Sequence, residues 1–81
     1  MARVSGQGDD EGLLKALGAS IRTRRKAMGL SQEALADAAG IDRSHMGKIE
    51  RGERNVTLLN IARVAAALND KPSEIMREAG L

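Results

Sequence analysis

The chain has 81 residues, a net charge of +2, one histidine, no cysteine and no aromatic residue. This length supports a single small domain, and the composition excludes disulfides, cysteine-ligated metal sites and the stacking platforms of single-stranded nucleic-acid binders. No apolar run approaches the roughly 20 residues that span a bilayer. We therefore expect a soluble, cytoplasmic domain that is not an enzyme and uses no metal or other cofactor.

The positive charge is concentrated in the middle of the chain. Residues 20–54 carry eight Lys or Arg against five Asp or Glu, whereas residues 1–19 carry two against three. Excess positive charge on a small domain favours a polyanionic partner, nucleic acid above all. A solvated basic face explains the same imbalance, so charge alone leaves both interpretations open.

The N-terminal segment differs in composition from the rest of the chain. Residues 1–10 are rich in glycine and acidic residues and have no apolar period, which predicts a disordered arm ahead of one domain over residues 11–81. A helical period then predicts a helix over about residues 11–28, with one apolar arc formed by Leu14, Leu17, Ile21 and Met28.

Capping residues delimit four further helices. Ser31, Asp42 and Thr57 are typical N-cap residues and predict helices over residues 32–39, over about 43–51 and from residue 58. Pro72 suits the first turn of a last helix that ends near residue 79. The helix after Thr57 has an apolar face composed of Leu58, Ile61, Ala62, Ala65 and Leu68. Five helices and no strand make the expected fold all-α.

The predicted helix over residues 43–51 has two faces at about 100° per residue. One face is apolar with Glu50 at its margin, and the other carries Arg43, Ser44, Gly47, Lys48 and Arg51. Arg and Lys can donate to guanine O6 and N7 in the major groove, and Ser can bond several base edges. Gly47, which has no side chain, would let the helix approach the groove closely. The polar face is either a DNA-binding surface or an ordinary solvated surface.

The connection between the two short helices favours the first of these interpretations. A helix ending in Ala-Ala-Gly, one apolar residue and a second capped helix form the layout of a helix-turn-helix. Through Leu30–Ala36, Gly40-Ile41 and Lys48–Gly52, the sequence resembles the phage-repressor and Cro-type helix-turn-helix family, over about residues 14–76.

The resemblance implies both a fold and a function. The fold would be a compact five-helix, lambda-repressor-like domain whose helix-turn-helix is formed by the second and third helices. The function would be that of a sequence-specific transcriptional regulator that binds double-stranded DNA as a homodimer on a palindromic operator. Such a protein would be bacterial or phage-encoded, cytoplasmic and associated with the nucleoid.

The resemblance also implies roles for individual residues. Base edges would be read by residues early in the 43–51 helix and one turn later, namely Arg43, Ser44 and Lys48, with Gly47 between them. Phosphates would be bound at the start of the 32–39 helix and along the loop after residue 50, which implies contacts by Gln32, Arg51, Arg54 and Asn55. Arg22, near the end of the first helix, either adds a phosphate contact or is solvated.

Several other residues are expected to be structural. Arg25 and Glu50 lie at the edges of two apolar faces, and because an unpaired buried charge is costly, we predict that they form a salt bridge, as is common in the family. His45 is a packing or phosphate-edge residue. The three internal methionines are predicted to fill the core: Met28, Met46 and Met76.

Two apolar features are candidates for a homodimer contact. One is Leu59, which lies around its helix from the apolar face, and the other is a C-terminal edge formed by Ile75, Met76, Ala79 and Leu81. Both are also compatible with plain core positions. Asp70 stands where relatives usually carry an apolar anchor for the last helix, which leaves the packing of that helix open.

No domain for sensing a small-molecule ligand and no membrane contact are expected. Small members of the family include controllers of restriction-modification systems, phage and plasmid repressors, and antitoxins. The runs Ile41–Ser44, Ile49–Arg51 and Arg54–Thr57 are most similar to the controllers. The alternative function is that of an antitoxin-type protein-interaction module with autoregulatory DNA binding.

Overall fold

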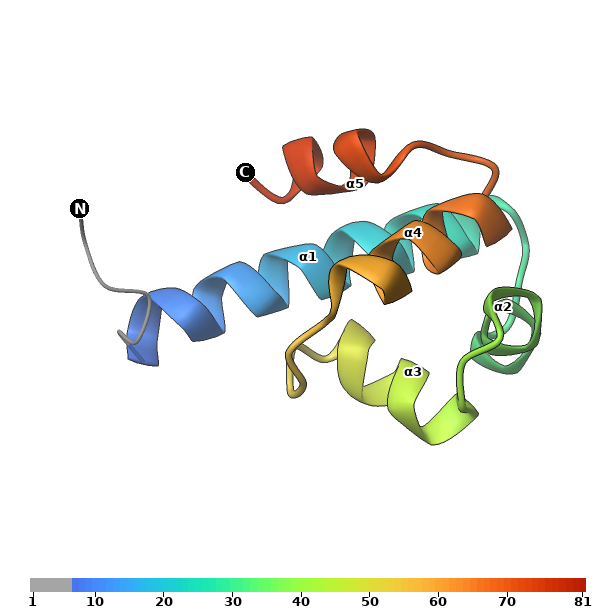
Figure 1. Cartoon of the computed structure of the whole chain (residues 1–81), viewed down its shortest axis with the longest axis horizontal. Helices are drawn as coiled ribbons and strands as arrows, with labels where there is room; N and C mark the ends of the chain where they lie inside the picture. Colours follow the sequence, from blue (N-terminus) through green and yellow to red (C-terminus); the bar gives the residue numbers. More distant parts are fainter. Residues whose placement is uncertain (1–6) are drawn as a thin grey trace.

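The computed structural model describes residues 7–81, and the side chains from residue 12 onward. Within that range the chain forms α1 (Gln7–Ala27), α2 (Gln32–Ala39), α3 (Arg43–Glu50), α4 (Leu58–Ala67) and α5 (Pro72–Glu78), and these residues form no strand. The predicted five-helix, all-α architecture is therefore confirmed. Figure 1 shows α1 as the long central helix, with α5 along one side of it and the α2–α3 pair on the other.

The first helix begins earlier than predicted. It starts at Gln7, so residues 7–10 of the predicted arm are helical, while residues 1–6 lie outside the described range. The prediction relied on apolar period, which residues 7–10 lack. Three acidic residues at positions 9–11 favour a helix N-terminus through the helix dipole, and apolar periodicity does not detect that effect.

Local capping interactions fix the ends of the short helices. The side chains of Ser31 and Thr57 accept hydrogen bonds from the backbone N–H groups of Ala34 and Asn60, at 3.0 and 3.1 Å. Gly40 ends α2 in the left-handed conformation, with φ of 70°, which glycine adopts without a steric penalty. Ser31 and Gly40 therefore begin and end α2 where the sequence predicts, and Thr57 does the same for the start of α4.

One apolar core joins all five helices. Its fully or nearly fully buried members are Leu17, Ile21, Leu35, Ala36, Ala39, Met46, Ile49, Ile61, Val64, Ala65, Leu68 and Ile75. Three residues predicted on apolar faces are instead exposed: Met28 at 48%, Leu58 at 72%, and Ala62. Met28 lies in the turn after α1 and Leu58 is the first residue of α4, so neither belongs to the part of its helix that packs on the core.

Two glycines permit the close packing of α3 on α1. A Cβ atom on Gly18 would lie 2.5 Å from the backbone oxygens of both Ile49 and Glu50. A Cβ atom on Gly52 would lie 2.7 Å from the Cα of Lys15. The role of Gly18 was not predicted from the sequence, although a glycine inside a helix indicates a close approach because it is otherwise unfavourable there. The C-terminal end of α3 is thereby held directly against the α1 backbone.

Candidate nucleic-acid interface

A buried ion pair fixes α3 relative to α1. Arg25 donates from Nε to Oε2 of Glu50 at 2.7 Å and from Nη2 to Oε1 at 3.1 Å. Its Nη1 donates to the Leu30 carbonyl at 2.8 Å. Arg25 and Glu50 are only 8% and 6% exposed. The predicted salt bridge is therefore formed, and its bidentate geometry is the one that makes arginine–carboxylate pairs strong.

The same carboxylate ties α2 to this pair. Gln32, the first residue of α2, donates from Nε2 to Oε1 of Glu50 at 3.0 Å. The amide nitrogen carries two hydrogens, so one remains for another acceptor. Three helices therefore meet at Glu50, and the orientation of α3 on the molecule is set by hydrogen bonds as well as by packing.

The outward face of α3 carries the residues predicted to read bases. Arg43 and Ser44 are exposed, and Lys48 is half-buried one turn later. Gly47 between them is buried, because a Cβ there would lie 3.2 Å from Nη1 of Arg51 and 3.5 Å from Oε1 of Gln32. In the structure the side chains of Arg51 and Gln32 lie next to Gly47, and a close approach of α3 to a groove at this residue stays a prediction.

Three of these residues, Arg43, Ser44 and Gly47, border a shallow hollow of about 480 Å³ on the molecular surface. It is lined by Gln32, Asp42, Arg43, Ser44, Gly47 and Arg51. The surface around this hollow carries three cations, Arg43, Lys48 and Arg51, against the carboxylates of Asp42 and Glu53, which leaves it net positive. The hollow also offers both hydrogen-bond donors and acceptors. Such a surface suits the phosphate and base edges of a nucleic acid.

The loop after α3 contributes a second ion pair. Arg51 donates from Nε to Oε2 of Glu53 at 3.0 Å, and both side chains are 55% exposed. The hydrogen bond from Arg51 holds the pKa of Glu53 below its ordinary value, with weaker help from the charges of Arg51 and Lys48. The Glu53 carboxylate therefore remains ionised to a lower pH than an unpaired glutamate would.

The other predicted phosphate residues are on the surface. Arg54 and Asn55 are exposed in the loop, and Arg22 is exposed on α1. The side-chain oxygen of Asn55 accepts the backbone N–H of Val56 at 2.9 Å, which leaves its amide N–H groups for another partner. His45 is half-buried, and its Nε2 is buried without a hydrogen-bond partner in residues 12–81.

A polar cluster holds α5 against α1 at the other side of the molecule. Arg24 forms ion pairs with Asp70 and with Glu78, and its Nη2 donates to the Glu74 carbonyl at 3.3 Å. Ser20 donates to the Ile75 carbonyl at 3.1 Å. Asp70, at a position that the sequence analysis treated as a missing apolar anchor, thus anchors α5 by charge. Sequence reasoning did not find this cluster.

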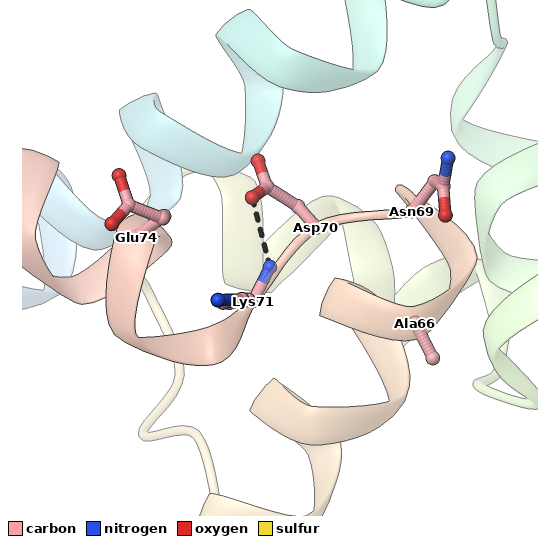
Figure 2. Close-up of a pocket in the computed structure, with 5 residues that line it drawn as sticks. All are labelled: Ala66, Asn69, Asp70, Lys71 and Glu74. Carbon is pink, nitrogen blue, oxygen red and sulfur yellow. Dashed lines mark hydrogen bonds between the residues drawn. The ribbon is translucent and has the colours of Figure 1, made fainter.

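A larger hollow of about 710 Å³ lies beside Asp70, at the turn between α4 and α5. Figure 2 shows its lining residues, with the Asp70 side chain accepting the backbone N–H of Lys71 at 2.8 Å. Both carboxylates are already held by arginines, Asp70 by Arg24 and Glu74 by Arg77. These ion pairs belong to the anchoring of α5, so the hollow on α3 is the better candidate for nucleic acid.

The residues predicted at a dimer contact divide into three groups. Ile75 is completely buried and its carbonyl is bonded to Ser20, so it is a core residue and the prediction that it lies at an interface is corrected. Met76 and Ala79 are half-buried against the core. Leu59 and Leu81 are 58% and 62% exposed and remain accessible to a partner.

Within the described residues, no three His, Asp or Glu side chains gather closely enough to hold a metal ion. None of the helices in this part of the chain has the length and apolar character required to cross a membrane.

Comparison with known proteins places the chain among regulators. Residues 21–75 match the model of the helix-turn-helix family HTH_3. The control protein C.SmaI of Serratia marcescens is 40% identical over 65 residues, which are 80% of this chain and 77% of that protein.

Solved structures agree in fold. The restriction-modification controller protein C.AhdI from Aeromonas hydrophila is 50% identical, with a TM-score of 0.76 over 76% of this chain and 94% of that one. The clp gene regulator ClgR from Corynebacterium glutamicum is 31% identical, with a TM-score of 0.81 over 84% of this chain and 72% of that one.

Proposed function

We propose, since the chain belongs to the helix-turn-helix family, that it is a DNA-binding transcriptional regulator of the restriction-modification controller type. It would occupy a palindromic operator in double-stranded DNA as a homodimer, in the cytoplasm and nucleoid of a bacterial or phage-infected cell. The likeness to the controllers C.SmaI and C.AhdI supports this class. These relatives bear the names of regulators rather than of enzymes, which supports a role without catalysis.

The observation that carries the proposal is the electropositive hollow on the outward face of α3. Arg43 and Ser44 lie at the start of α3, where a helix inserted into the major groove brings its side chains to base edges. Lys48 follows one turn later on the same face. Because the Arg25–Glu50 pair and its bond to Gln32 hold α2 and α3 rigidly, these side chains keep a fixed spacing that a base sequence can match.

Phosphate contacts would flank the base-reading residues. Gln32 has a free amide hydrogen at the start of α2, where the helix dipole also favours an anion. Arg54 and Asn55 in the loop and Arg22 on α1 are exposed donors on the surface. Binding through several such contacts should weaken as salt rises, because each neutralised phosphate releases counterions.

The homodimer would use the exposed apolar residues near the C-terminal part of the chain. Leu59 and Leu81 are the exposed candidates, with half-buried Met76 and Ala79 beside the core. A twofold dimer would place two copies of α3 in successive major grooves, about 34 to 36 Å apart. Operator half-sites would then be separated by about one helical turn.

The test is selection of bound duplexes from a randomised DNA library at near-physiological salt. We expect a twofold-symmetric site for the wild type. In Arg43→Ala, preference should be lost at one position in each half-site, with affinity for the preferred base falling by about 5- to 150-fold. Arg63→Ala, which removes an exposed arginine from α4, is the matched control and should leave the selected site unchanged.

Failure of the wild type to enrich any site would contradict the proposal. Weak, salt-sensitive binding without sequence preference would mean that α3 is only a charged surface. Enrichment of a single asymmetric half-site would support sequence-specific recognition but contradict binding as a homodimer.

A further inference from the structure

Arg51 lies against the base-reading face of α3 and not along the loop that follows it. It caps the C-terminal end of the helix, and its guanidinium group extends back over Gly47. It thereby lines the same hollow as Arg43 and Ser44. Arg54 and Asn55, the other loop residues assigned to phosphates, do not line it.

The guanidinium group of Arg51 is oriented by one carboxylate and retains free donors. Its Nε donates to Oε2 of Glu53 at 3.0 Å, and within residues 12–81 neither Nη1 nor Nη2 donates a hydrogen bond. Arginine carries five N–H donors in a fixed fork, so the two terminal nitrogens remain available above the hollow. A fork with this freedom matches O6 and N7 of guanine.

Gly47 makes room for this arrangement. A Cβ atom at position 47 would lie 3.2 Å from Nη1 and 3.9 Å from Cζ of Arg51. Because 3.2 Å is shorter than an ordinary van der Waals contact, a side chain at position 47 would displace the guanidinium group from α3. A glycine inside a helix is unfavourable by itself, and the space it leaves here is occupied by Arg51.

Glu53 distinguishes a base-reading role from a phosphate role. A residue that binds phosphate works chiefly through its charge, and a neighbouring carboxylate opposes that attraction. A residue that reads a base depends on the direction in which its donors point. A carboxylate partner narrows that direction even where, as here, solvent screens the attraction between the two charges. Pairing with Glu53 therefore weakens the attraction of Arg51 for phosphate but orients its guanidinium group.

We infer that Arg51, positioned by Glu53 across Gly47, reads a base edge of the operator and so determines sequence specificity together with Arg43. The inference rests on the proposed function, because it assumes that the hollow on α3 faces DNA. It replaces the phosphate contact that the family resemblance implies for Arg51.

The test is the same duplex selection, extended to Arg51→Ala, Glu53→Ala and Arg54→Ala. In Arg51→Ala we expect preference to disappear at one symmetric pair of operator positions, distinct from that of Arg43, with a loss of about 5- to 150-fold for the preferred base there. Arg54→Ala, the matched loop arginine, should weaken binding evenly across sequences and reduce the salt slope by about one.

The variant Glu53→Ala tests whether Glu53 positions the guanidinium group of Arg51 or only repels the DNA by its charge. Removal of a negative charge should strengthen binding to nonspecific duplexes, while preference at the Arg51 positions should fall because the guanidinium group is no longer held. All three side chains are exposed, so thermal melting should show the variants folded as the wild type is.

The outcomes distinguish this inference from the proposed function. If the wild type selects a symmetric site and Arg51→Ala lowers affinity evenly for all sequences, Arg51 is a phosphate residue and the inference is overturned alone. Unchanged preference at every position in Glu53→Ala would overturn the positioning role of Glu53. If the wild type selects no site, the proposed function and this inference both fail.

Discussion

Two adjacent arginines of α1 hold opposite sides of the molecule in different ways. Arg25 reaches Glu50 of α3, where the two side chains are 10% and 1% exposed. Arg24 reaches Asp70 and Glu78 around α5, where the exposures are 20% for Arg24, 25% for Asp70 and 57% for Glu78. The first pair is sealed from water and the second is open to it.

The difference indicates which part of the fold must be rigid. The donors of Arg25 that face the protein are all paired, and its partner also binds Gln32. Arg24 has a buried Nε without a partner in the described residues and divides its charge between two carboxylates. Solvent screens such exposed pairs. The helix-turn-helix is thus fixed more firmly on α1 than α5 is.

The largest expected effect comes from breaking the buried pair. Arg25→Ala should cost about 3 to 5 kcal/mol of unfolding free energy, because it leaves the Glu50 carboxylate buried and partly unpaired. Chemical denaturation monitored by circular dichroism would measure this loss. A loss below about 1 kcal/mol would show that the Arg25–Glu50 pair is as weak as the partly exposed Arg24–Asp70 pair, and would contradict the difference drawn between them.

A steric change should weaken the same side of α1. Gly18→Ala places a Cβ 2.5 Å from two backbone oxygens of α3, and such overpacking typically costs about 1 to 3 kcal/mol. Gly12→Ala is the matched control, because a Cβ there meets nothing within 4 Å and should stabilise α1 by about 1 kcal/mol. Thermal melting of both variants tests whether Gly18→Ala is the less stable of the two. Equal melting temperatures would contradict the close approach of α3 to α1.

The α5 side should respond less to the loss of its arginine. Arg24→Ala is expected to cost about 1 kcal/mol or less, since the pairs are partly exposed. A double-mutant cycle with Asp70→Ala should give a coupling energy of at least about 0.5 kcal/mol for these contacting residues. Additive effects would mean that Asp70 does not anchor α5 through Arg24.

The smallest effect is a titration at the start of α5. The pKa of Glu74 lies below its ordinary value of 4.5, chiefly because Arg77 donates a hydrogen bond to it, and Arg24 adds a weak attraction. A lowered pKa stabilises the fold above pH 4.5, and this contribution is lost as pH falls through the lowered pKa. Side-chain NMR titration should show the Glu74 pKa rising in Arg77→Ala and less in Arg24→Ala, and the reverse order would be inconsistent with these contacts.

Features within a few residues of one another were predictable. The N-caps Ser31 and Thr57 and the turn at Gly40 follow from hydrogen bonds and backbone preferences over three or four positions. The Arg25–Glu50 pair joins residues 25 positions apart, and it was predictable because both side chains fall at the margin of an apolar face and the family has such a bridge.

Other features were decided only in the tertiary structure. The exposure of Leu58, the close approach at Gly18 and the placement of Arg51 over Gly47 depend on where whole helices lie, which no periodic pattern encodes. The Arg24–Asp70 pair joins residues 46 positions apart, on segments with no shared pattern.

The five helices, their caps and the set of polar residues on α3 thus follow from the amino-acid sequence alone, because they depend on local interactions and on the period of the helix. The tertiary structure decided which of these polar residues share one hollow, which apolar residues are covered and how α5 is anchored. Long-range packing of the helices sets those contacts, and each is made by side chains that are distant in the chain.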